Sequence, residues 1–248
     1  MAEASQSGVP GEPGSQPSSL AGGSGEGNKP AAPTGPFLVV GLGNPGPDYF
    51  WTPHNAGFMA IDRIAGQEGV VVQNRRCRAM TASCRIAGRE VILAKPETFM
   101  NLSGASVAAL VREYEADPAH NLLVIYDELD LKLGTIKIRE RGSTAGHNGA
   151  RSVTAALGSQ EWLRLRIGVG KEMPPEAIAA GASKRGGRDY LLSPMNKRDL
   201  ATLDEVLDRV ATAVRRILEA GRGAAMNEFN RREDRDQGPG IRDHKNPD

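Results

Sequence analysis

Five residues that could do chemistry together lie in four short segments where apolar runs of the sequence break: His54, Asp127, Asn44, Asn101 and Asn148. The segments are GLGNPGPDYFWTPHNAG (41–57), KPETFMNLSG (95–104), IYDELD (125–130) and GSTAGHNGARS (142–152). Loops on a rigid scaffold are where catalytic residues concentrate. Histidine can accept a proton near neutral pH, a carboxylate can orient its ring, and neutral amides can hold carbonyl oxygens. This set of residues therefore favours the activation of water beside a carbonyl group.

Each of these residues also has a purely structural alternative. Asn44 could serve a turn with the Pro-Gly that follows it, and Asn101 could lie at the N-terminal end of a helix. The acidic residues 127–130 could form an ordinary loop after a strand. His147 could have no role beyond capping a helix, so Asn148 is the better candidate for a functional residue in that segment.

The sequence lacks convincing motifs for a covalent nucleophile, a metal or a cofactor, which favours a simple hydrolytic site. The sequence holds no G-x-S-x-G, and neither Cys77 nor Cys84 stands in a motif with histidine, so direct attack by water is favoured over a covalent nucleophile. The cysteines lack C-x-x-C spacing, so we expect no metal. The segment 41–46 is a literal G-x-G-x-x-G, but its proline disturbs the turn and the next helical pattern begins only near Ala56. We therefore expect no dinucleotide cofactor.

The segments between these motifs predict alternating strands and helices. Apolar runs or alternating patterns predict strands at 37–42, 69–73, 79–86, 90–94, 121–126, 135–139 and 162–169. Helical spacing of apolar residues predicts helices at 56–66, 103–114, 148–157 and 198–220, the last of which ends at Gly221. Interleaved strands and helices predict a single α/β domain in which a mostly buried mixed sheet is flanked by helices.

Composition limits the class of protein. The chain has 248 residues, of which 25% are charged and 39% hydrophobic, as in globular proteins. The domain is expected at 37–230, between disordered tails at 1–36 and 231–248 that are too polar to form a core. No apolar run reaches the ~18 residues of a membrane helix, so we expect no membrane partner. Two cysteines in a chain of this length favour a reducing compartment.

The distribution of charge permits a nucleic-acid partner. Residues 1–35 and 233–248 each carry a net charge of −2, so the +1 of the whole chain leaves +5 for residues 36–232. Lys137 and Arg139 are two positions apart on a predicted strand and therefore share one face of it. A solvated face is the default interpretation of such a pair. If the pair contacts phosphates instead, binding will weaken as salt is added.

Five motifs together resemble those of bacterial-type peptidyl-tRNA hydrolases. They are GLGNPGPDYFWTPHNAGF, KPETFMNLSG, YDELDLKLG, GHNG and LRLRIGVG, and the resemblance covers about residues 37–230, including AAMNEFN near the end. It implies a single α/β domain without metal or cofactor. It also implies hydrolysis of the ester that joins a peptide to the 3′ ribose of tRNA, after premature release from ribosomes. We expect a monomer in the cytoplasm, with an organellar stroma or matrix as the alternative.

The resemblance implies a role for each matching residue. His54 matches the catalytic histidine and Asp127 the aspartate that pairs with it. Residues that match the substrate-binding positions are Asn44, Tyr49, Met100, Asn101 and Asn148. The basic residues Lys137, Arg139 and Arg166 fall where the family contacts tRNA phosphates. Recognition is expected to follow the shape of the acceptor stem and the 3′ end rather than base sequence.

Three departures from the family pattern accompany the match. The Gly- and His-rich stretch that the family has before GHNG is replaced by Arg141-Gly-Ser-Thr-Ala145. Pro53 stands where the family usually has arginine before the histidine, and residues 171–188 are longer and more basic than is typical. The main rival function is that of a non-catalytic RNA- or partner-binding relative that assists splicing of organellar group II introns. The presence of His54 together with YDELD favours the enzyme.

Overall fold

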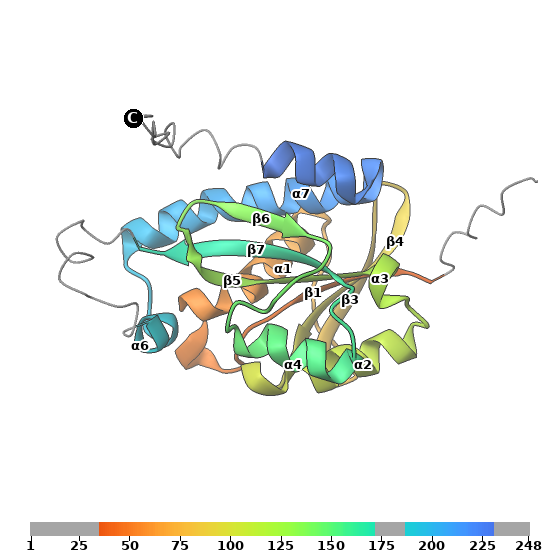
Figure 1. Ribbon diagram of the computed structural model, residues 1–248, viewed down its shortest axis with the longest axis horizontal. Helices are drawn as coiled ribbons and strands as arrows, with labels where there is room; N and C mark the ends of the chain where they lie inside the picture. Colours follow the sequence, from red (N-terminus) through yellow and green to blue (C-terminus); the bar gives the residue numbers. More distant parts are fainter. Residues whose placement is uncertain (1–34, 172–186, 231–248) are drawn as a thin grey trace, which may run out of the picture. The chain divides into compact units, whose positions relative to one another are not determined.

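Seven strands form one mixed sheet in the computed structural model, which describes residues 35–171 and 187–230 (Figure 1). The order is β2-β3-β4-β1-β5-β7-β6. The four central strands run parallel, and antiparallel neighbours complete the sheet at both ends. The strands are β1 (Phe37–Gly41), β2 (Asn74–Arg76), β3 (Ala79–Ile86), β4 (Arg89–Pro96), β5 (Leu122–Lys132), β6 (Ile136–Arg139) and β7 (Leu163–Gly170).

Helices cover both faces of this sheet. The longer ones are α1 (Ala56–Gln67), α2 (Ser103–Glu113), α4 (Asn148–Leu157) and α7 (Lys197–Phe229), and the short ones are α3 (Pro118–Asn121), α6 (Gly187–Leu192), η1 (Pro47–Tyr49), η2 (Pro53–Asn55) and η3 (Met100–Leu102). Helices α1 and α7 pack against one face, and α2 and α4 pack against the other (Figure 1). The predicted class of fold, a buried mixed sheet flanked by helices, is confirmed. No described helix is long and apolar enough to cross a membrane.

The central strand β1 shows why its sequence is apolar throughout. All five of its residues are buried. Val39 points into the core beneath α1 and α7, whereas Leu38 and Val40 point into the core beneath α2 and α4. Because helices cover both faces of this parallel strand, side chains on both faces are buried in apolar cores. The alternation of polar and apolar residues that is typical of half-exposed strands is therefore absent.

The start of α1 lies unusually close to the ends of two strands. A methyl group added at Gly57 would lie 2.4 Å from the carbonyl oxygen of Leu42 and 2.5 Å from that of Ile125. Because both are backbone atoms, the clash cannot be relieved by a side-chain rotation. This close approach holds the segment before α1 against the sheet.

We therefore expect Gly57→Ala to lower the free energy of unfolding by about 3 kcal/mol, as overpacking does. Gly66→Ala in the same helix is the matched control, since a methyl group there has no atom within 4 Å. It should raise the free energy of unfolding by about 0.5–1 kcal/mol, because alanine restricts the unfolded chain and favours helix. Urea denaturation of both variants compares them directly. Equal destabilisation of the two would contradict the close approach.

The predicted strand at 69–73 is wrong. Residues 69–73 pair with no strand, and β2 begins only at Asn74. Within β2, Arg75 lies opposite Met80 of β3 across a tight hairpin turn. Val70 and Val72 instead pack singly against the core. Their β-branched side chains suited a strand, but no neighbouring strand lies within reach of their backbone. Apart from the C-terminal ends of β5 and α7, the other predicted boundaries agree within two residues, and 79–86 and 148–157 match β3 and α4.

Two further elements differ from the prediction at their ends. Strand β5 continues past Tyr126 to Lys132, with an irregularity in its pairing to β7, so residues 127–130 are not a loop after a strand. Helix α7 does break at Gly221, where φ is 84° and ψ is 165°, but helix resumes at once and runs to Phe229. The side chain of Asn230 then bonds both the N–H and the carbonyl of Ile138 on the edge strand β6.

The predicted tails at 1–36 and 231–248 lie outside the described residues, apart from Gly35 and Pro36. Gly35 belongs to the ordered part, since its carbonyl accepts a hydrogen bond from the Asn121 side chain at 3.2 Å. Most of the segment 171–188 also lies outside the described residues. The tail boundaries stay predictions.

Candidate active site

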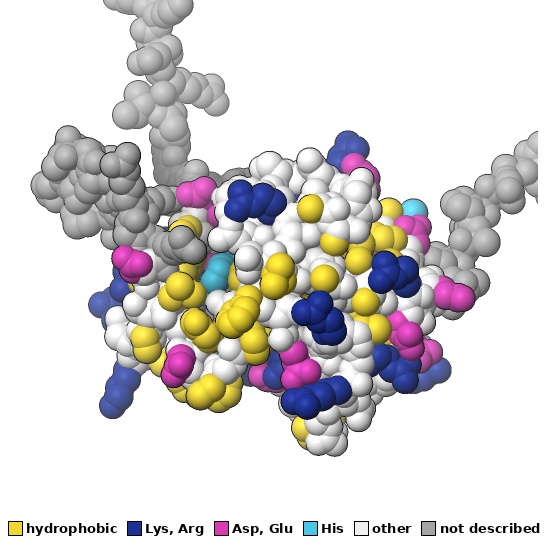
Figure 2. Space-filling view, turned by 90° about the horizontal axis from the view of Figure 1, so that it is seen from below, with side chains coloured by type: hydrophobic (Ala, Val, Ile, Leu, Met, Phe, Trp, Pro, Cys, Tyr) yellow, Lys and Arg dark blue, Asp and Glu magenta, His cyan; other side chains and the backbone are white. Residues whose placement is uncertain are grey.

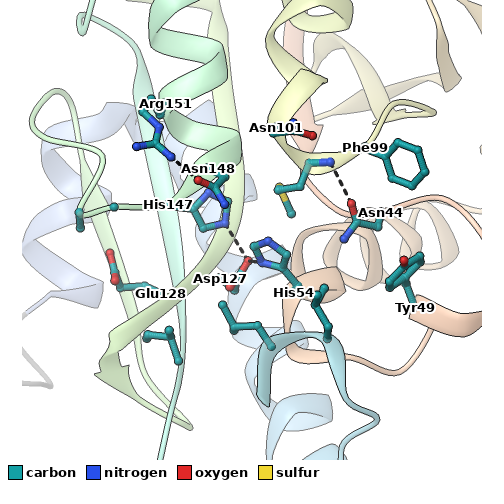
Figure 3. Close-up of a pocket in the computed structure, with 16 residues that line it drawn as sticks. Asn44, Tyr49, His54, Phe99, Asn101, Asp127, Glu128, His147, Asn148 and Arg151 are labelled. Carbon is teal, nitrogen blue, oxygen red and sulfur yellow. Dashed lines mark hydrogen bonds and ion pairs between the residues drawn. The ribbon is translucent and has the colours of Figure 1, made fainter. Parts of the chain in front are cut away.

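A cavity of about 730 Å³ opens where the parallel strands end (Figure 3). Its walls come from the segment after β1, strand β5, the turn before α2, the N-terminus of α4, and α6. Ligands of open α/β sheets bind in this position, beyond the carboxyl ends of parallel strands. All seven residues predicted as catalytic or substrate-binding line the cavity: Asn44, Tyr49, His54, Met100, Asn101, Asp127 and Asn148.

His54 and Asp127 are 73 residues apart in sequence and form a buried hydrogen bond in the structure. The distance from His54 Nδ1 to Asp127 Oδ1 is 2.8 Å. The exposed fractions are 8% for His54 and 1% for Asp127. Pro53 occupies the first position of η2, where its fixed φ suits the turn and its missing N–H costs nothing. The proline thus sets the direction from which His54 enters the cavity.

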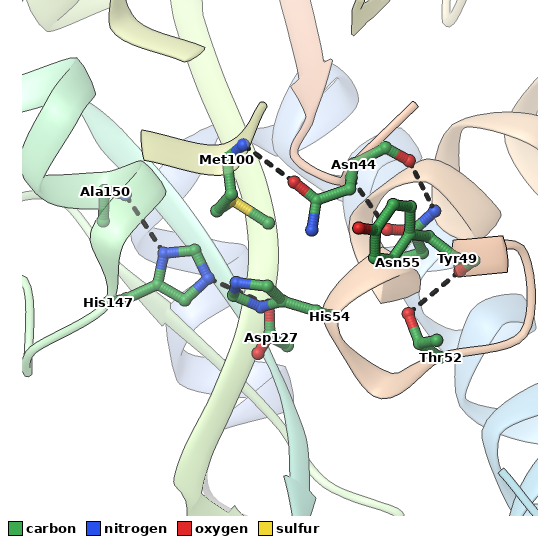
Figure 4. Close-up of polar contacts among 9 residues, drawn as sticks. All are labelled: Asn44, Tyr49, Thr52, His54, Asn55, Met100, Asp127, His147 and Ala150. Atoms are coloured by element: carbon green, nitrogen blue, oxygen red, sulfur yellow. Dashed lines mark hydrogen bonds and ion pairs between the residues drawn. The ribbon is translucent and has the colours of Figure 1, made fainter. Parts of the chain in front are cut away.

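A second histidine, His147, bonds the same carboxylate oxygen. His147 Nε2 lies 2.9 Å from Asp127 Oδ1, and the two imidazole rings are 5.1 Å apart (Figure 4). The Nδ1 atom of His147 accepts a hydrogen bond from the Ala150 N–H, which caps α4. The expectation of a helix cap is therefore correct, but the bond to Asp127 was missed. The only sequence signal for this bond was the position of His147 within the GHNG motif that the chain shares with the family.

These contacts determine where the protons reside. Because Nδ1 of His147 accepts from a backbone N–H, its Nε2 carries the proton and donates to Asp127. An ionised Asp127 can only accept, so Nδ1 of His54 also donates to it. In the neutral form of the ring this leaves Nε2 of His54, across the ring from the carboxylate, without a proton at the cavity. His54 is therefore arranged as a base.

Asp127 is held in its charged form. Burial alone would raise its pKa, but the attraction and hydrogen bonds of His147 and His54 outweigh burial and hold the pKa well below the usual range. The carboxylate is therefore ionised throughout the neutral range. It can fix the ring of His54 and stabilise the imidazolium that forms when the ring takes a proton.

Asn44 is locked to the two segments that border it. Its backbone N–H and carbonyl bond the side chain of Asn55 at 2.8 and 3.0 Å. Its side-chain oxygen accepts from the N–H of Met100 at 2.9 Å, which leaves the amide nitrogen pointing into the cavity (Figure 4). The turn that Asn44 makes is thus part of the site, and a neutral donor is presented opposite His54.

The other predicted substrate residues surround this centre. Asn101 is exposed in η3, which leads directly into α2, and the N-terminal end of α2 has no side-chain cap. Asn148 begins α4, and its oxygen accepts from Arg151 (Figure 3). Large exposed hydrophobic side chains lie on the segments that border the cavity: Phe50, Trp51, Phe99, Leu102 and Leu192. Figure 2 shows hydrophobic side chains gathered beside the hollow in which a histidine is visible.

The predicted phosphate-binding residues lie outside the cavity, on β6 and β7. Lys137 is directly opposite Arg166, and Arg139 is opposite Arg164. The guanidinium of Arg166 pairs with Glu128 at 3.1 Å, so much of its charge is already compensated. Arg164 is 1% exposed and bonds the carbonyls of the loop before His147. Arg164 therefore supports that loop.

The same centre is the one group of potential metal ligands found in the described part of the chain. The ligand atoms of His54, Asp127 and His147 lie within 4.8 Å of one another. Both rings, however, point a nitrogen at a single carboxylate oxygen at hydrogen-bond distance. A cation would have to replace both hydrogen bonds. The arrangement thus suits proton transfer.

Fold and site together define an α/β protein in which a histidine base, two partners that orient it and neutral amides face one cavity. Residues 38–237 match the sequence profile of the peptidyl-tRNA hydrolase family. The chain belongs to this family.

Individual relatives agree with that assignment. A peptidyl-tRNA hydrolase of Acidobacterium capsulatum is 60% identical over 197 residues, which cover 79% of this chain and 96% of the relative. One of Koribacter versatilis is 52% identical, over 79% of this chain and 92% of its own length. The crystal structure of peptidyl-tRNA hydrolase from Acinetobacter baumannii superposes with a TM-score of 0.68 and 31% identity, covering 79% of this chain and 94% of that one.

Proposed function

We propose that the protein hydrolyses peptidyl-tRNA and that His54 is the general base. Nε2 of His54 takes a proton from water, whose oxygen attacks the ester carbonyl carbon. The bond from that carbon to the ribose oxygen then breaks, and the proton passes from the imidazolium to the leaving oxygen. The products are a peptide acid and tRNA with a free 3′ end. The observation that carries the proposal is the buried bond from His54 to an ionised Asp127 in a cavity lined by amides.

The amides have a separate role in this proposal. A negatively charged oxygen develops when water adds to the carbonyl, and donors already in place stabilise it without reorganisation. The nitrogen of Asn44 is held in place by the Met100 contact, which makes it the best-fixed donor. Asn101 and Asn148 also line the cavity and can bond the peptide carbonyls, and Tyr49 lines it for the 3′ ribose. None of these groups carries charge that would alter the base.

The experiment that tests the function compares two substrates. Wild-type protein should release N-acetylphenylalanine from N-acetylphenylalanyl-tRNA and leave phenylalanyl-tRNA intact. The two carboxylates that line the cavity, those of Asp127 and Glu128, are buried and already paired with the two histidines and with Arg166, so neither is available to a free ammonium group. Absence of any release would favour the non-catalytic RNA-binding alternative. We also propose that the protein acts in the cytoplasm, and as a monomer because every residue of the proposed site comes from one chain.

His147 should act by positioning Asp127. Two variants separate its two hydrogen bonds. His147→Gln retains a donor near the position of Nε2, whereas His147→Asn retains an acceptor for the Ala150 N–H but loses the donor to Asp127. We expect the asparagine variant to lower kcat about tenfold, the value of one hydrogen bond to a charged group, and the glutamine variant to lose less. Equal kcat in both variants would argue against the role. Single-turnover release measures it.

We propose that Lys137 and Arg139 contact phosphates of the acceptor stem, while Arg166, paired with Glu128, contributes less. The Arg139→Gln variant should weaken binding of deacylated tRNA and lower the slope of log affinity against log salt by about one. Arg85→Gln is the control, because Arg85 is exposed on β3 toward the opposite side of the sheet. The same slope in Arg139→Gln and wild type would remove Arg139 from the interface.

A further inference from the structure

A second cavity, of about 860 Å³, shares a wall with the catalytic one. The wall is the segment that carries η1 and η2. Tyr49 and His54 face the catalytic cavity, whereas Phe50, Trp51 and Asn55 face the second cavity. Helices α1 and α7 form its sides, and the buried residues Leu203 and Leu207 belong to its lining. We call this second cavity the α1–α7 groove.

Phe50 and Trp51 are presented to the groove on a rigid support. They are 56% and 61% exposed, although the four residues that follow them are buried. The carbonyl of Trp51 accepts from the N–H of Met195 at 2.9 Å, and Thr52 donates to the carbonyl of Tyr49 through both its backbone and its hydroxyl. Aromatic rings held in this way bind apolar groups at little cost in conformational entropy.

The charges around the groove do not suit a polyanion. Lys95 pairs with Asp62 at 2.5 Å, and Arg63 pairs with Asp204. The two carboxylates are 57% and 67% exposed, so they would repel phosphates. With Lys197 counted, the charged lining sums to only +1. An apolar, largely uncharged chain fits this surface better than RNA does.

The order of the sheet indicates which part of the substrate reaches the groove. Strand β5, with Asp127, lies between β7 and β6, which carry the basic residues, and β1 and β4, beside which the groove opens. With the tRNA on the basic side and the ester at His54, the peptide must leave toward β1 and β4. This step rests on the proposed function.

We propose that the α1–α7 groove binds the peptide part of the substrate, at apolar side chains several residues before the esterified one. An extended hexapeptide spans about 20 Å, which exceeds the ~10 Å thickness of one packed layer of chain. A peptide of this length can thus pass from the catalytic cavity across the shared wall to Phe50 and Trp51. The groove makes the enzyme more efficient on long apolar peptides than on short ones.

The test compares three substrates: N-acetylphenylalanyl-tRNA, a hexapeptidyl-tRNA with leucine at its first three positions, and the same hexapeptide with serine there. The double variant Phe50→Ala, Trp51→Ala should raise KM about tenfold for the leucine peptide, the loss typical of an interface aromatic. KM for the two other substrates should change less than twofold. Val71→Ala is the matched control, since Val71 is 67% exposed and lines neither cavity. It should leave all three values unchanged.

Three outcomes would overturn the proposal. An equal loss on all substrates would mean that the aromatic residues only support the catalytic segment. No loss on any substrate would mean that the peptide does not reach them. Weaker inhibition of the double variant by deacylated tRNA would mean that they contact RNA. Failure of the proposed function itself is distinguishable, because wild-type protein would then release nothing from N-acetylphenylalanyl-tRNA.

Discussion

His54→Ala should abolish nearly all release of peptide from peptidyl-tRNA, with a fall in kcat of about 10²–10⁴-fold, the range of general base catalysis. KM should change little, because the amides and the basic residues Lys137 and Arg139, which are proposed to bind substrate, remain. Release from N-acetylphenylalanyl-tRNA under single-turnover conditions measures kcat, and competition by deacylated tRNA measures binding.

His120→Ala is the control for this result. His120 is also a histidine near a carboxylate, at 2.5 Å from Asp117, but its side chain is 60% exposed and does not line the cavity. Its activity should equal that of the wild type. If His54→Ala kept more than a tenth of wild-type kcat, the base would have to be another group.

Asp127→Asn should lower kcat about 100-fold and leave the geometry of the site largely intact. In a serine protease triad the same change costs ~10⁴-fold, because the histidine takes the wrong tautomer. Here the donor Nε2 of His147 is fixed by the Ala150 N–H, and it should hold the new amide with its oxygen toward both rings. His54 then keeps its tautomer and loses only the charge that stabilises the imidazolium. Removing the donor as well, in Asp127→Asn with His147→Phe, should increase the loss further.

The same variant should change how stability depends on pH. The folded-state pKa of Asp127 is depressed, so its carboxylate stabilises the fold above its unfolded pKa of about 3.9, and the contribution is lost as pH falls through the folded value. Asp127→Asn has no such group, so its free energy of unfolding should fall less steeply between pH 5 and pH 3. Urea titrations across that range compare the slopes. Parallel slopes would contradict a depressed pKa.

Local patterns were sufficient to predict most elements that carry the site. The apolar run before Asp127 and the helical spacing after Asn148 correspond to β5 and α4. The strand predicted at 69–73 failed because valines favour a strand only when a partner strand is near, and partners are supplied by the fold. The alternative of a loop at 127–130 failed for the opposite reason, since pairing with β7 extends a strand through a polar sequence.

The candidate site divides in the same way. Residue types and the family match were enough to bring His54, Asp127 and the asparagines to one cavity. They did not reveal that Arg166 is paired with Glu128, or that His147 shares the carboxylate with His54. Each of these contacts joins side chains that are remote in sequence, so no local pattern reports it.

The sequence alone was enough to predict the class of fold, a histidine base with an acidic partner, and a set of amides. These features could be predicted because periodicity and motif spacing are local properties of the chain. Only the tertiary structure decided which nitrogen of His54 is free, how the charge of Asp127 is maintained, and that a second groove lies behind the catalytic segment. Those features depend on distances between atoms of different elements, and distances are determined when the helices and strands pack.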